Sequence, residues 1–328
     1  MYSLIRRLLF QLDAESAHEF TVAQMVRLQE IPLALSLIAR LCRPRHDYRQ
    51  LWGLTFATPI GIAAGFDKNA LLMPFLAALG FGFLEVGTVT LNAQPGNPKP
   101  RVFRDPEHLA LINRLGFNND GADAVAQRLQ RWREKATDPP PLFVNIGKNR
   151  DVPLDAAPNA YAQCYLRVGR WAEGAVLNLS SPNTPGLREL QRPEHLVKVL
   201  ELVRAVREEM PFARPILVKI SPDLDPELLA EVCDVCGKLA DGMVCTNTTV
   251  IPEGGLSGKP LFGRSTDVLR EVRECVGPNY PLIGVGGIFD ANDARAKLAA
   301  GANLLQVYTG FVYEGPGLPS RLARDLAR

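Results

Sequence analysis

The sequence of 328 residues lacks the features that mark several large classes of protein. None of its apolar runs reaches the roughly 18 residues that a membrane-spanning helix needs. Its net charge is only +2, and its Lys and Arg residues are scattered, so nucleic acid is not an expected partner. Its six cysteines show no framework spacing, and we expect no cleavable signal peptide, which favours a reducing compartment.

Motifs that identify several common enzyme classes are also missing. The sequence shows no paired carboxylates for glycoside hydrolysis, no His and carboxylate cluster for zinc and no P-loop. The C-x-x-C pair Cys233 and Cys236 lies inside a helical pattern with no second ligand pair nearby, so core cysteines are the better interpretation. We therefore expect no metal, and any demanding chemistry would need a bound cofactor.

Short apolar runs alternate with helical patterns from about Tyr48 onward. Continuous apolar strands are typical of a parallel sheet covered by helices, and eight of them favour a (β/α)8 barrel over an open doubly wound sheet. The expected strands are 59–63, 83–86, 142–145, 175–178, 216–219, 242–245, 282–285 and 304–307. The expected helices between them are 71–79, 121–133, 161–171, 193–209, 226–239, 266–275 and 292–300.

The first 45 residues have a different pattern, with apolar residues at helical spacing around arginines. Leu4 to Leu12 predict one short amphipathic helix, Asp13 can cap a second, and Pro32 suits the first turn of a third. Two interpretations remain open for this segment. It could be a helical cap on the main domain, or a monotopic hairpin that lies in a membrane surface with its arginines toward the head groups.

The connection 88–141 is too long for a plain loop. Part of it is the helix near Arg131, and the rest contains Pro95, Pro98 and Pro100. We expect this second part to be an ordered excursion over the mouth of the barrel.

In a barrel enzyme the active site lies at the C-terminal ends of the strands, so the residues that follow each apolar run should form one ring. The richest member is Asn178-Leu-Ser-Ser-Pro-Asn-Thr-Pro-Gly-Leu-Arg188, whose composition suits a rigid polar loop, although these are also ordinary turn residues. The other members are 65–68, Gly87 with Thr88, Asn145, Lys219, 246–248, Gly286 with Gly287, and 308–310.

Two glycine-containing segments of this ring are candidates for binding a phosphate. Gly284-Val-Gly-Gly287, followed by Asp290 at the start of a helix, and Tyr308-Thr-Gly310 occupy the loops after strands 7 and 8, where barrels often bind phosphate. Bare amides near a helix N-terminus favour an anion. Either segment alone could simply be a tight turn, but their joint position favours the phosphate site.

Three side chains of the ring are candidates for chemistry. Lys219 closes an apolar strand, so it must pair in a salt bridge or stabilise an anion such as a reduced flavin. Lys68 could form an ion pair with Asp67 or hold a substrate carboxylate. Ser181 is more plausible as a general base than as an acyl nucleophile, and a base of this kind needs a proton relay and a dry site. Alternatively, Ser181 only stabilises its loop.

Several motifs together resemble the dihydroorotate dehydrogenase family, in its membrane-associated, quinone-using class. Besides the segment Asn178 to Arg188, they are Ala64-Gly-Phe-Asp-Lys68, Asn113-Arg-Leu-Gly-Phe117, Gly96-Asn-Pro-Lys-Pro-Arg-Val-Phe-Arg104, Gly255-Leu-Ser-Gly258 and Gly284-Val-Gly-Gly-Ile288. The similarity covers essentially the whole chain and includes Asp13-Ala-Glu-Ser-Ala-His18, a part that soluble members lack. Phe66, where an aliphatic residue would be expected, is a minor departure.

The resemblance implies an FMN enzyme of pyrimidine biosynthesis that oxidises dihydroorotate to orotate and passes electrons to a membrane quinone. Ser181 would be the catalytic base, a position that is Cys in the soluble class. The implied substrate residues are Lys68, Asn113, Arg114, Leu115, Gly116, Phe117, Asn178, Asn183, Asn247 and Thr248. The implied FMN residues are Ala64, Gly65, Phe66, Asp67, Lys68, Thr88, Asn145, Asn178, Lys219, Thr246, Gly258, Gly287, Tyr308 and Thr309. His18, Arg104 and Tyr308 would line the quinone route.

The resemblance also implies a division of the chain into a helical membrane-associating extension, 1–45, and an FMN-binding barrel, 46–328. We expect a monomer that associates peripherally with the cytoplasmic side of the cell membrane. The alternatives are a soluble-type FMN barrel that uses fumarate or NAD, and a non-catalytic barrel that binds a phosphate ligand at a membrane.

Overall fold

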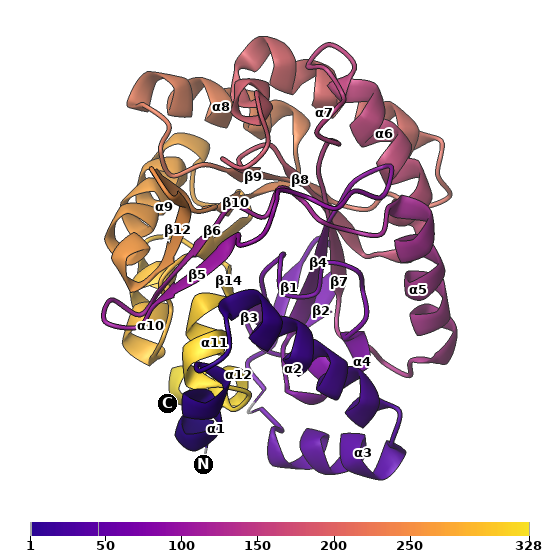
Figure 1. Ribbon diagram of the computed structural model, residues 1–328. Coiled ribbons are helices and arrows are strands. Elements are labelled where there is room, and N and C mark those ends of the chain that lie inside the picture. The colour runs from indigo at the N-terminus through magenta and orange to yellow at the C-terminus, as the bar shows by residue number, and fades with distance from the viewer. Residues whose placement is uncertain (1, 45, 328) are drawn as a thin grey trace.

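The computed structural model, which describes residues 2–44 and 46–327, is built around a closed barrel of eight parallel strands (Figure 1). The predicted (β/α)8 barrel is thereby confirmed. The order of strands around the barrel is β10-β13-β14-β3-β4-β7-β8-β9. Their bounds are β3 Ile60–Ile62, β4 Phe83–Val89, β7 Leu142–Ile146, β8 Gly174–Asn178, β9 Ile216–Ile220, β10 Gly242–Cys245, β13 Leu282–Val285 and β14 Leu304–Val307.

Helices surround this barrel and bury its outer face (Figure 1). The predicted helix 266–275 extends four residues further toward its N-terminus than expected. The core cysteines Cys233 and Cys236 are buried on α8, as predicted. The helices are α4 Met73–Ala78, α5 Ala122–Lys135, α6 Ala157–Val168, α7 Pro193–Glu208, α8 Pro226–Leu239, α9 Phe262–Val276, α10 Ala291–Ala299, α11 Thr309–Glu314 and α12 Leu318–Leu326, with short 3-10 turns η1 Gly169–Trp171, η2 Leu187–Gln191 and η3 Lys259–Leu261.

Aromatic side chains fill the barrel interior at the N-terminal ends of the strands. Phe83 and Phe143 point inward, with their ring centroids 6.1 Å apart, and Phe56 closes the bottom of the barrel from a hairpin of β1 (Arg49–Leu51) and β2 (Leu54–Phe56). Gly61 leaves room for this packing, because a Cβ there would come within 2.4 Å of the Phe83 ring. The bottom of the barrel is therefore solid, and any ligand must enter from the opposite end.

An antiparallel sheet covers part of the open end of the barrel. It has the order β11-β12-β6-β5, with bounds β5 Val102–Asp105, β6 Ala110–Asn113, β11 Thr249–Ile251 and β12 Gly254–Gly258. The predicted ordered excursion after Thr88 supplies β5 and β6. The loop after β10 supplies the other two strands, which the sequence pattern did not predict.

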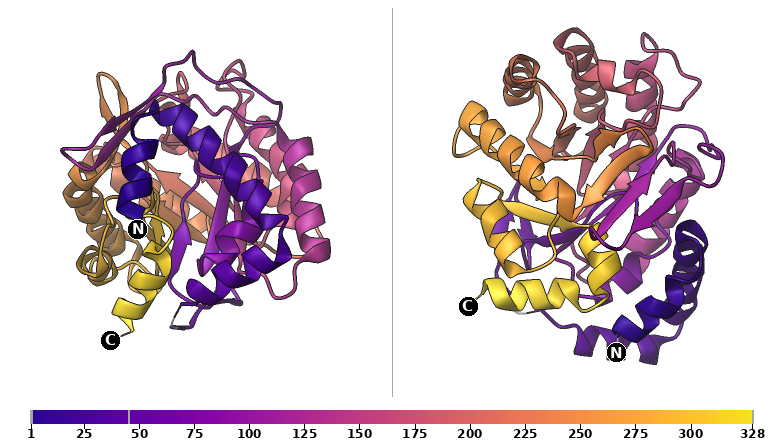
Figure 2. Two further views of the ribbon diagram at one scale, coloured as in Figure 1. Left: turned by 60° about the horizontal axis from the view of Figure 1, so that its bottom comes forward. Right: turned by 60° about the vertical axis from the view of Figure 1, so that its left-hand side comes forward.

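Three N-terminal helices lie against one side of the barrel (Figure 2). They are α1 Tyr2–Leu9, α2 Ala14–Gln29 and α3 Pro32–Leu41. As predicted, the Asp13 side chain caps α2 by accepting from the amides of Glu15 and Ser16, and Pro32 occupies the first turn of α3. Residue 45, where the predicted domain boundary falls, lies outside the described residues.

Large apolar side chains are exposed mainly on these three helices. Ten of the 14 exposed large hydrophobic residues in the described chain belong to residues 4–41, and Leu33 and Leu41 are 81% and 75% exposed. No described helix meets by itself the length and hydropathy needed to cross a bilayer; α2 and α3 do so only when taken together, and they are bent by 107° at their junction.

Candidate active site

A single cavity at the C-terminal ends of the barrel strands collects most of the predicted site residues. It encloses about 1130 Å³ of empty space, solvent at its mouth included, which is enough for a ligand of nucleotide size. Lys68, Ser181, Lys219 and Thr309 line the same cavity, so the expected ring exists. The other predicted residues on its wall are Ala64, Gly65, Thr88, Asn113, Leu115, Gly116, Phe117, Asn178, Asn183, Thr246, Asn247, Thr248, Gly258, Gly287 and Tyr308.

A network of side-chain amides and hydroxyls forms one wall of this cavity. The Asn178 amide nitrogen donates to Thr88 Oγ1 at 3.1 Å, and its Oδ1 accepts from the Asn247 amide nitrogen at 3.2 Å. The side-chain amide nitrogen of Asn183 donates to Asn113 Oδ1 at 3.1 Å, so polar side chains from β4, β6 and β8 and from the loops after β8 and β10 line the same wall. Such a surface suits a planar ligand with several amide groups.

The Ser181 loop is held in place from outside. The Arg188 guanidinium donates to Ser180 O at 3.1 Å and to Thr248 O at 3.3 Å, and it pairs with Asp223 at 2.9 Å. Ser181 itself is only 6% exposed, and its Oγ accepts from the backbone amide of Asn183 at 3.3 Å. The serine is thus fixed at a nearly dry wall of the cavity, which meets one requirement for a serine base.

Lys68 does not form an ion pair with Asp67, which was one of the two roles that the sequence suggested for it. The buried Asp67 carboxylate accepts instead from the backbone amides of Leu71 and Leu72, at 2.8 and 2.7 Å, and caps the turn before α4. Burial lowers the pKa of Lys68 to about 8, partly offset by the charge of Glu15. Lys68 therefore lines the cavity as a cation that loses its proton in a mildly alkaline solution.

Lys219 likewise has no salt bridge with any described residue, so the interpretation that it pairs in a salt bridge was wrong. It is 6% exposed and lines the cavity, and within the described residues its ammonium has neither a carboxylate within 4.0 Å nor a hydrogen-bond acceptor. A buried cation without a partner is costly. Lys219 is therefore well placed to meet an anionic group of a ligand.

The predicted phosphate segments meet at one side of the cavity, although not through the helix start that we expected. Asp290 and Asp293 cap the N-terminus of α10 with a capping box, so the first amides of α10 already have carboxylate partners. The backbone amides of Gly286 and Gly287 have no acceptor among the described residues. Both glycines have positive φ, +110° and +74°, and a Cβ at Gly287 would meet Phe262 at 2.5 Å.

Several predicted residues lie outside the cavity wall. Asn145 lies behind Thr88, whose hydroxyl donates to it at 2.5 Å, and the Arg114 side chain donates to Pro100 O. The Phe66 ring packs beside Tyr308, with a centroid distance of 6.0 Å, while Asp67 is the turn cap described above. Their predicted contacts with FMN or substrate would have to be indirect or made through the backbone.

Some residues on the cavity wall were not predicted, and Gln306 is the most informative. Its side chain lines the cavity from within β14, which the sequence shows as Leu304-Leu-Gln-Val307. A polar residue inside an apolar strand was the available signal, as it was for Lys219. The further wall residues that neither the predicted ring nor the predicted phosphate segments contained are Ala63, Val102, Leu111, Asn118, Ser257, Leu261, Ile288 and Val307.

The three residues predicted for a quinone route are placed differently from one another. The His18 ring, on α2, contacts Phe66 edge-on at 5.3 Å, and Phe66 contacts the cavity residue Tyr308. Burial, together with the charge of Lys68, lowers the pKa of His18 to about 3, so the imidazole is neutral at physiological pH. Arg104 instead donates to the carbonyls of Leu12 and Asp13 at 2.8 and 3.1 Å, and these bonds stabilise the turn between α1 and α2.

Comparisons with known proteins agree with this geometry. Residues 48–328 match the family model described as dihydroorotate dehydrogenase. A dihydroorotate dehydrogenase (quinone) of Alkalilimnicola ehrlichii is 46% identical over 343 residues, with 100% of this chain and 99% of the relative covered, and one of Gloeobacter violaceus is 45% identical over 342 residues, with 100% and 94% covered. The crystal structure of an Eimeria tenella DHODH in complex with ferulenol superposes with a TM-score of 0.83 at 36% identity, covering 95% of this chain and 90% of that one.

Proposed function

The chain belongs to the dihydroorotate dehydrogenase family, and on that premise we propose that it oxidises (S)-dihydroorotate to orotate in pyrimidine biosynthesis, with FMN as cofactor and a membrane quinone as electron acceptor. The observation that supports this most is the single cavity that joins Ser181, the asparagine side chains and two lysines, neither of which has a carboxylate within 4.0 Å among the described residues. The relatives that carry the word quinone in their names favour this acceptor over fumarate or NAD.

The residues around the cavity fit an FMN. Lys219 supplies an unpartnered cation, the Gly286 and Gly287 amides supply donors for a phosphate, and a buried amide oxygen of Gln306 lacks a donor among the described residues. We assign the phosphate to the side of Gly258, Gly287 and Thr309, and the ring to the side of Thr88 and Lys219. When bound, FMN supplies an acceptor for the substrate hydride and a donor of electrons for the quinone.

The chain's own residues would bind dihydroorotate and move its proton. The Lys68 ammonium holds the carboxylate, while Asn113, Asn183 and Asn247 orient the ring amides by hydrogen bonds. Ser181 Oγ takes the proton from C5 as its own hydroxyl proton leaves, and the hydride of C6 goes to the acceptor that bound FMN would supply, so that the C5–C6 bond becomes double. The proton must then pass from Ser181 to solvent, because its Oγ has no described carboxylate or histidine within hydrogen-bond distance.

An acceptor assay tests the proposed function. The purified protein should be yellow, dihydroorotate should bleach it without oxygen, and a lipophilic quinone should restore the flavin absorbance. Fumarate and NAD should restore it at least about tenfold more slowly. Equal rates with fumarate would support the soluble-type alternative, and a colourless protein that does not bind FMN would support the non-catalytic one.

The pH dependence of substrate binding tests the role of Lys68. Its ammonium is charged below its pKa of about 8 and neutral above it, while the substrate carboxylate stays ionised throughout this range. We therefore expect KM for dihydroorotate to rise roughly tenfold per pH unit above about pH 8. In a Lys68→Arg variant, whose guanidinium keeps its charge, the rise should be absent; an unchanged pH profile in that variant would contradict the assignment.

We assign the N-terminal helices, within the proposed extension 1–45, to peripheral association with the cytoplasmic side of the cell membrane. Leu33, Leu37 and Leu41 recur every four residues and form one exposed apolar face of α3. His18, Phe66 and Tyr308 form a row of rings from α2 to the cavity, and we assign the approach of a lipophilic quinone to this side of the cavity. The barrel, proposed as 46–328, would act as a monomer.

Substitution of this apolar face tests membrane association. A Leu33→Glu, Leu37→Glu and Leu41→Glu triple variant should bind vesicles at least about tenfold more weakly, because the free energy gained when each leucine side chain leaves water for the membrane is lost. Flavin reduction by dihydroorotate should stay unchanged, while turnover with a membrane-bound quinone should fall. Leu166→Glu with Leu202→Glu, at exposed sites on α6 and α7, is the matched control and should sediment with vesicles like the wild type.

A further inference from the structure

Four polar side chains point into the barrel directly above its aromatic floor. Glu85, Asn145, Lys219 and Gln306 each follow an inward-facing apolar residue of their strand by two positions, namely Phe83, Phe143, Leu217 and Leu304. Because side chains alternate along a strand, the polar four face inward as well. Glu85 and Asn145 are fully buried, and Gln306 is 1% exposed. The cavity therefore has a polar layer at its base, and the mechanism above uses only Lys219 from it.

The Glu85 carboxylate organises this layer. One of its oxygens accepts from the Asn145 amide nitrogen at 2.7 Å, and the other accepts from the amide nitrogen of Gln306. Among the described residues Glu85 has no Lys or Arg within 4.0 Å, so it acts here only as an acceptor of hydrogen bonds. Both amides are consequently oriented with their nitrogens toward Glu85 and their oxygens away from it.

The two amide oxygens that Glu85 turns away have different partners. Asn145 Oδ1 accepts from the Thr88 hydroxyl at 2.5 Å and from the Asn178 amide nitrogen at 3.2 Å. Gln306 Oε1 is buried and accepts from no described residue, although the Gln306 side chain lines the cavity. A buried acceptor without a donor is strongly unfavourable, so this oxygen requires a partner that the protein does not provide.

We propose that Gln306 is a further ligand contact, whose Oε1 accepts a hydrogen bond from a ring N–H of the bound flavin, and that Glu85 is the positioning residue that fixes this orientation. The inference rests on the proposed function to the extent that it requires a flavin in the cavity. The oxidised flavin ring carries one N–H, so a single fixed acceptor beside it would contribute both affinity and ring orientation. Glu85 does not contact the ligand and acts only through Gln306 and Asn145.

The Glu85→Gln variant tests the orientation. The introduced amide has one oxygen and one NH2 group, so it cannot accept from both neighbouring amides. If it keeps the bond from Asn145, the Gln306 amide must rotate and present its NH2 to the cavity. We expect FMN to dissociate about tenfold more readily from the purified holoenzyme, and flavin fluorescence measures this release. The visible absorption band and the midpoint potential of the bound flavin should also shift.

The exchanged double variant, Glu85→Gln with Gln306→Glu, separates this role from simple loss of packing. The amide introduced on β4 would accept from Asn145 and donate to the carboxylate introduced on β14, whose second oxygen again faces the cavity as an acceptor. FMN retention and the flavin spectrum should return toward those of the wild type. The control is Asn303→Ala. Asn303 lies just before β14, at the other end of the barrel, and its side-chain Oδ1 accepts from the backbone amide of Leu282 at 2.8 Å. This variant should lower Tm without changing FMN release.

The outcomes distinguish this inference from the proposed function. Gln306→Leu should weaken FMN retention about as much as Glu85→Gln does; if neither variant changes FMN release or the flavin spectrum, an internal water satisfies Gln306 and the inference is wrong. It is also wrong if the double variant loses FMN as readily as Glu85→Gln. These results leave the reaction with dihydroorotate untouched, whereas a wild-type protein that binds no flavin would overturn the proposed function itself.

Discussion

Replacing Ser181 with alanine is expected to slow reduction of the bound flavin by dihydroorotate by about 10²- to 10⁴-fold, the usual contribution of a positioned general base. The serine is nearly buried and fixed by its loop, so water cannot easily replace its oxygen. Binding of dihydroorotate should change little, because in the proposed site the asparagine network and Lys68 would hold the substrate. Stopped-flow measurement of flavin bleaching without oxygen separates the two quantities.

Ser180→Ala is the matched control for this experiment. Ser180 is the neighbouring residue and fully buried, but it does not line the cavity; its hydroxyl donates to Asn178 Oδ1 at 3.2 Å. We expect this variant to reduce stability and substrate affinity while the rate of flavin reduction stays within about tenfold of wild type. A Ser181→Ala enzyme with a rate close to wild type would exclude Ser181 as the base.

Replacing Glu15 with alanine is expected to destabilise the protein by about 3–5 kcal/mol, because it leaves a buried arginine without its counter-charge. The Arg101 guanidinium pairs with Glu15 at 2.8 Å, and their side chains are only 7% and 9% exposed. Arg101 also donates to Pro95 O and Asn97 O, so the pair links α2 to the segment over the barrel mouth. Urea denaturation at pH 7 measures the change.

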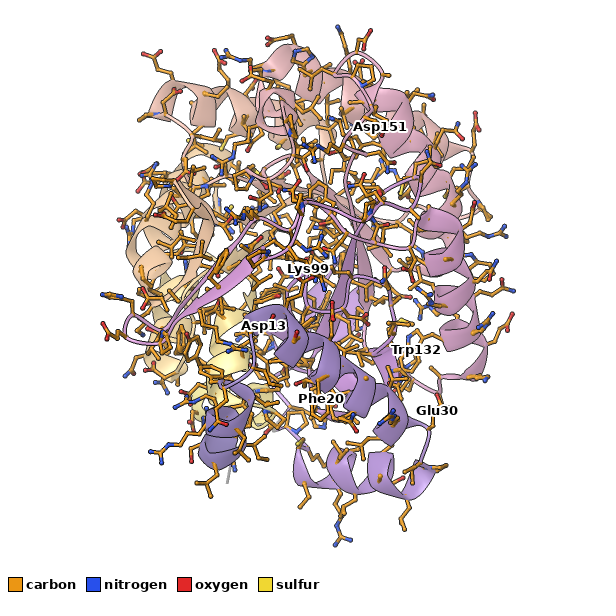
Figure 3. All side chains as sticks on the ribbon, in the orientation of Figure 1. Asp13, Phe20, Glu30, Lys99, Trp132 and Asp151 are labelled. Atoms are coloured by element: carbon orange, nitrogen blue, oxygen red, sulfur yellow. The ribbon has the colours of Figure 1, made fainter. Side chains whose placement is uncertain are left out.

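Glu19→Ala provides the comparison, since Glu19 pairs with the same segment from an exposed position. Its carboxylate lies 2.7 Å from Lys99, and both side chains are more than half exposed, so the loss should be at most about 1 kcal/mol. Lys99 lies beside α2 between the labelled ends Asp13 and Glu30 (Figure 3). Equal destabilisation by the two variants would show that the buried Glu15–Arg101 pair contributes no more to stability than the exposed Glu19–Lys99 pair.

The acid dependence of this link has a defined sign. Burial raises the pKa of Glu15, but the hydrogen bonds and charge of Arg101, together with Lys99, outweigh it and hold the pKa below its usual value of 4.5. The stabilisation is therefore complete above pH 4.5 and is lost as the pH falls through the lowered pKa. The Glu15→Ala variant should lack this part of the acid transition.

The barrel was predictable because its eight strands carry a strong local signal. Each is a short run made up mostly of apolar residues, as in 282–285, and the structure has a strand at every predicted position. The antiparallel sheet was not predictable in this way. Its central pairing joins Leu256 to Ile112, which are far apart in the chain, and β12 consists largely of glycine, so no local pattern announces it.

The candidate site was predictable where a polar residue ends or follows an apolar run of the sequence, and not where it lies in the middle of one. Lys68, Ser181 and Lys219 were found because they end or follow an apolar run. Glu85 and Gln306 lie within such runs, and only the inward alternation of the closed barrel shows that both face the same space. The pairing of Asp67 with backbone amides, rather than with Lys68, depends on the course of the turn before α4, which the sequence does not specify.

The segment from Gln94 to Arg101 contacts both the wall of the cavity and the N-terminal helices. On one side, the Asn97 side chain donates to Asn183 O at 3.2 Å, beside the polar cavity; on the other side, Lys99 and Arg101 hold α2. One short segment therefore fixes both the polar wall of the cavity and the position of α2.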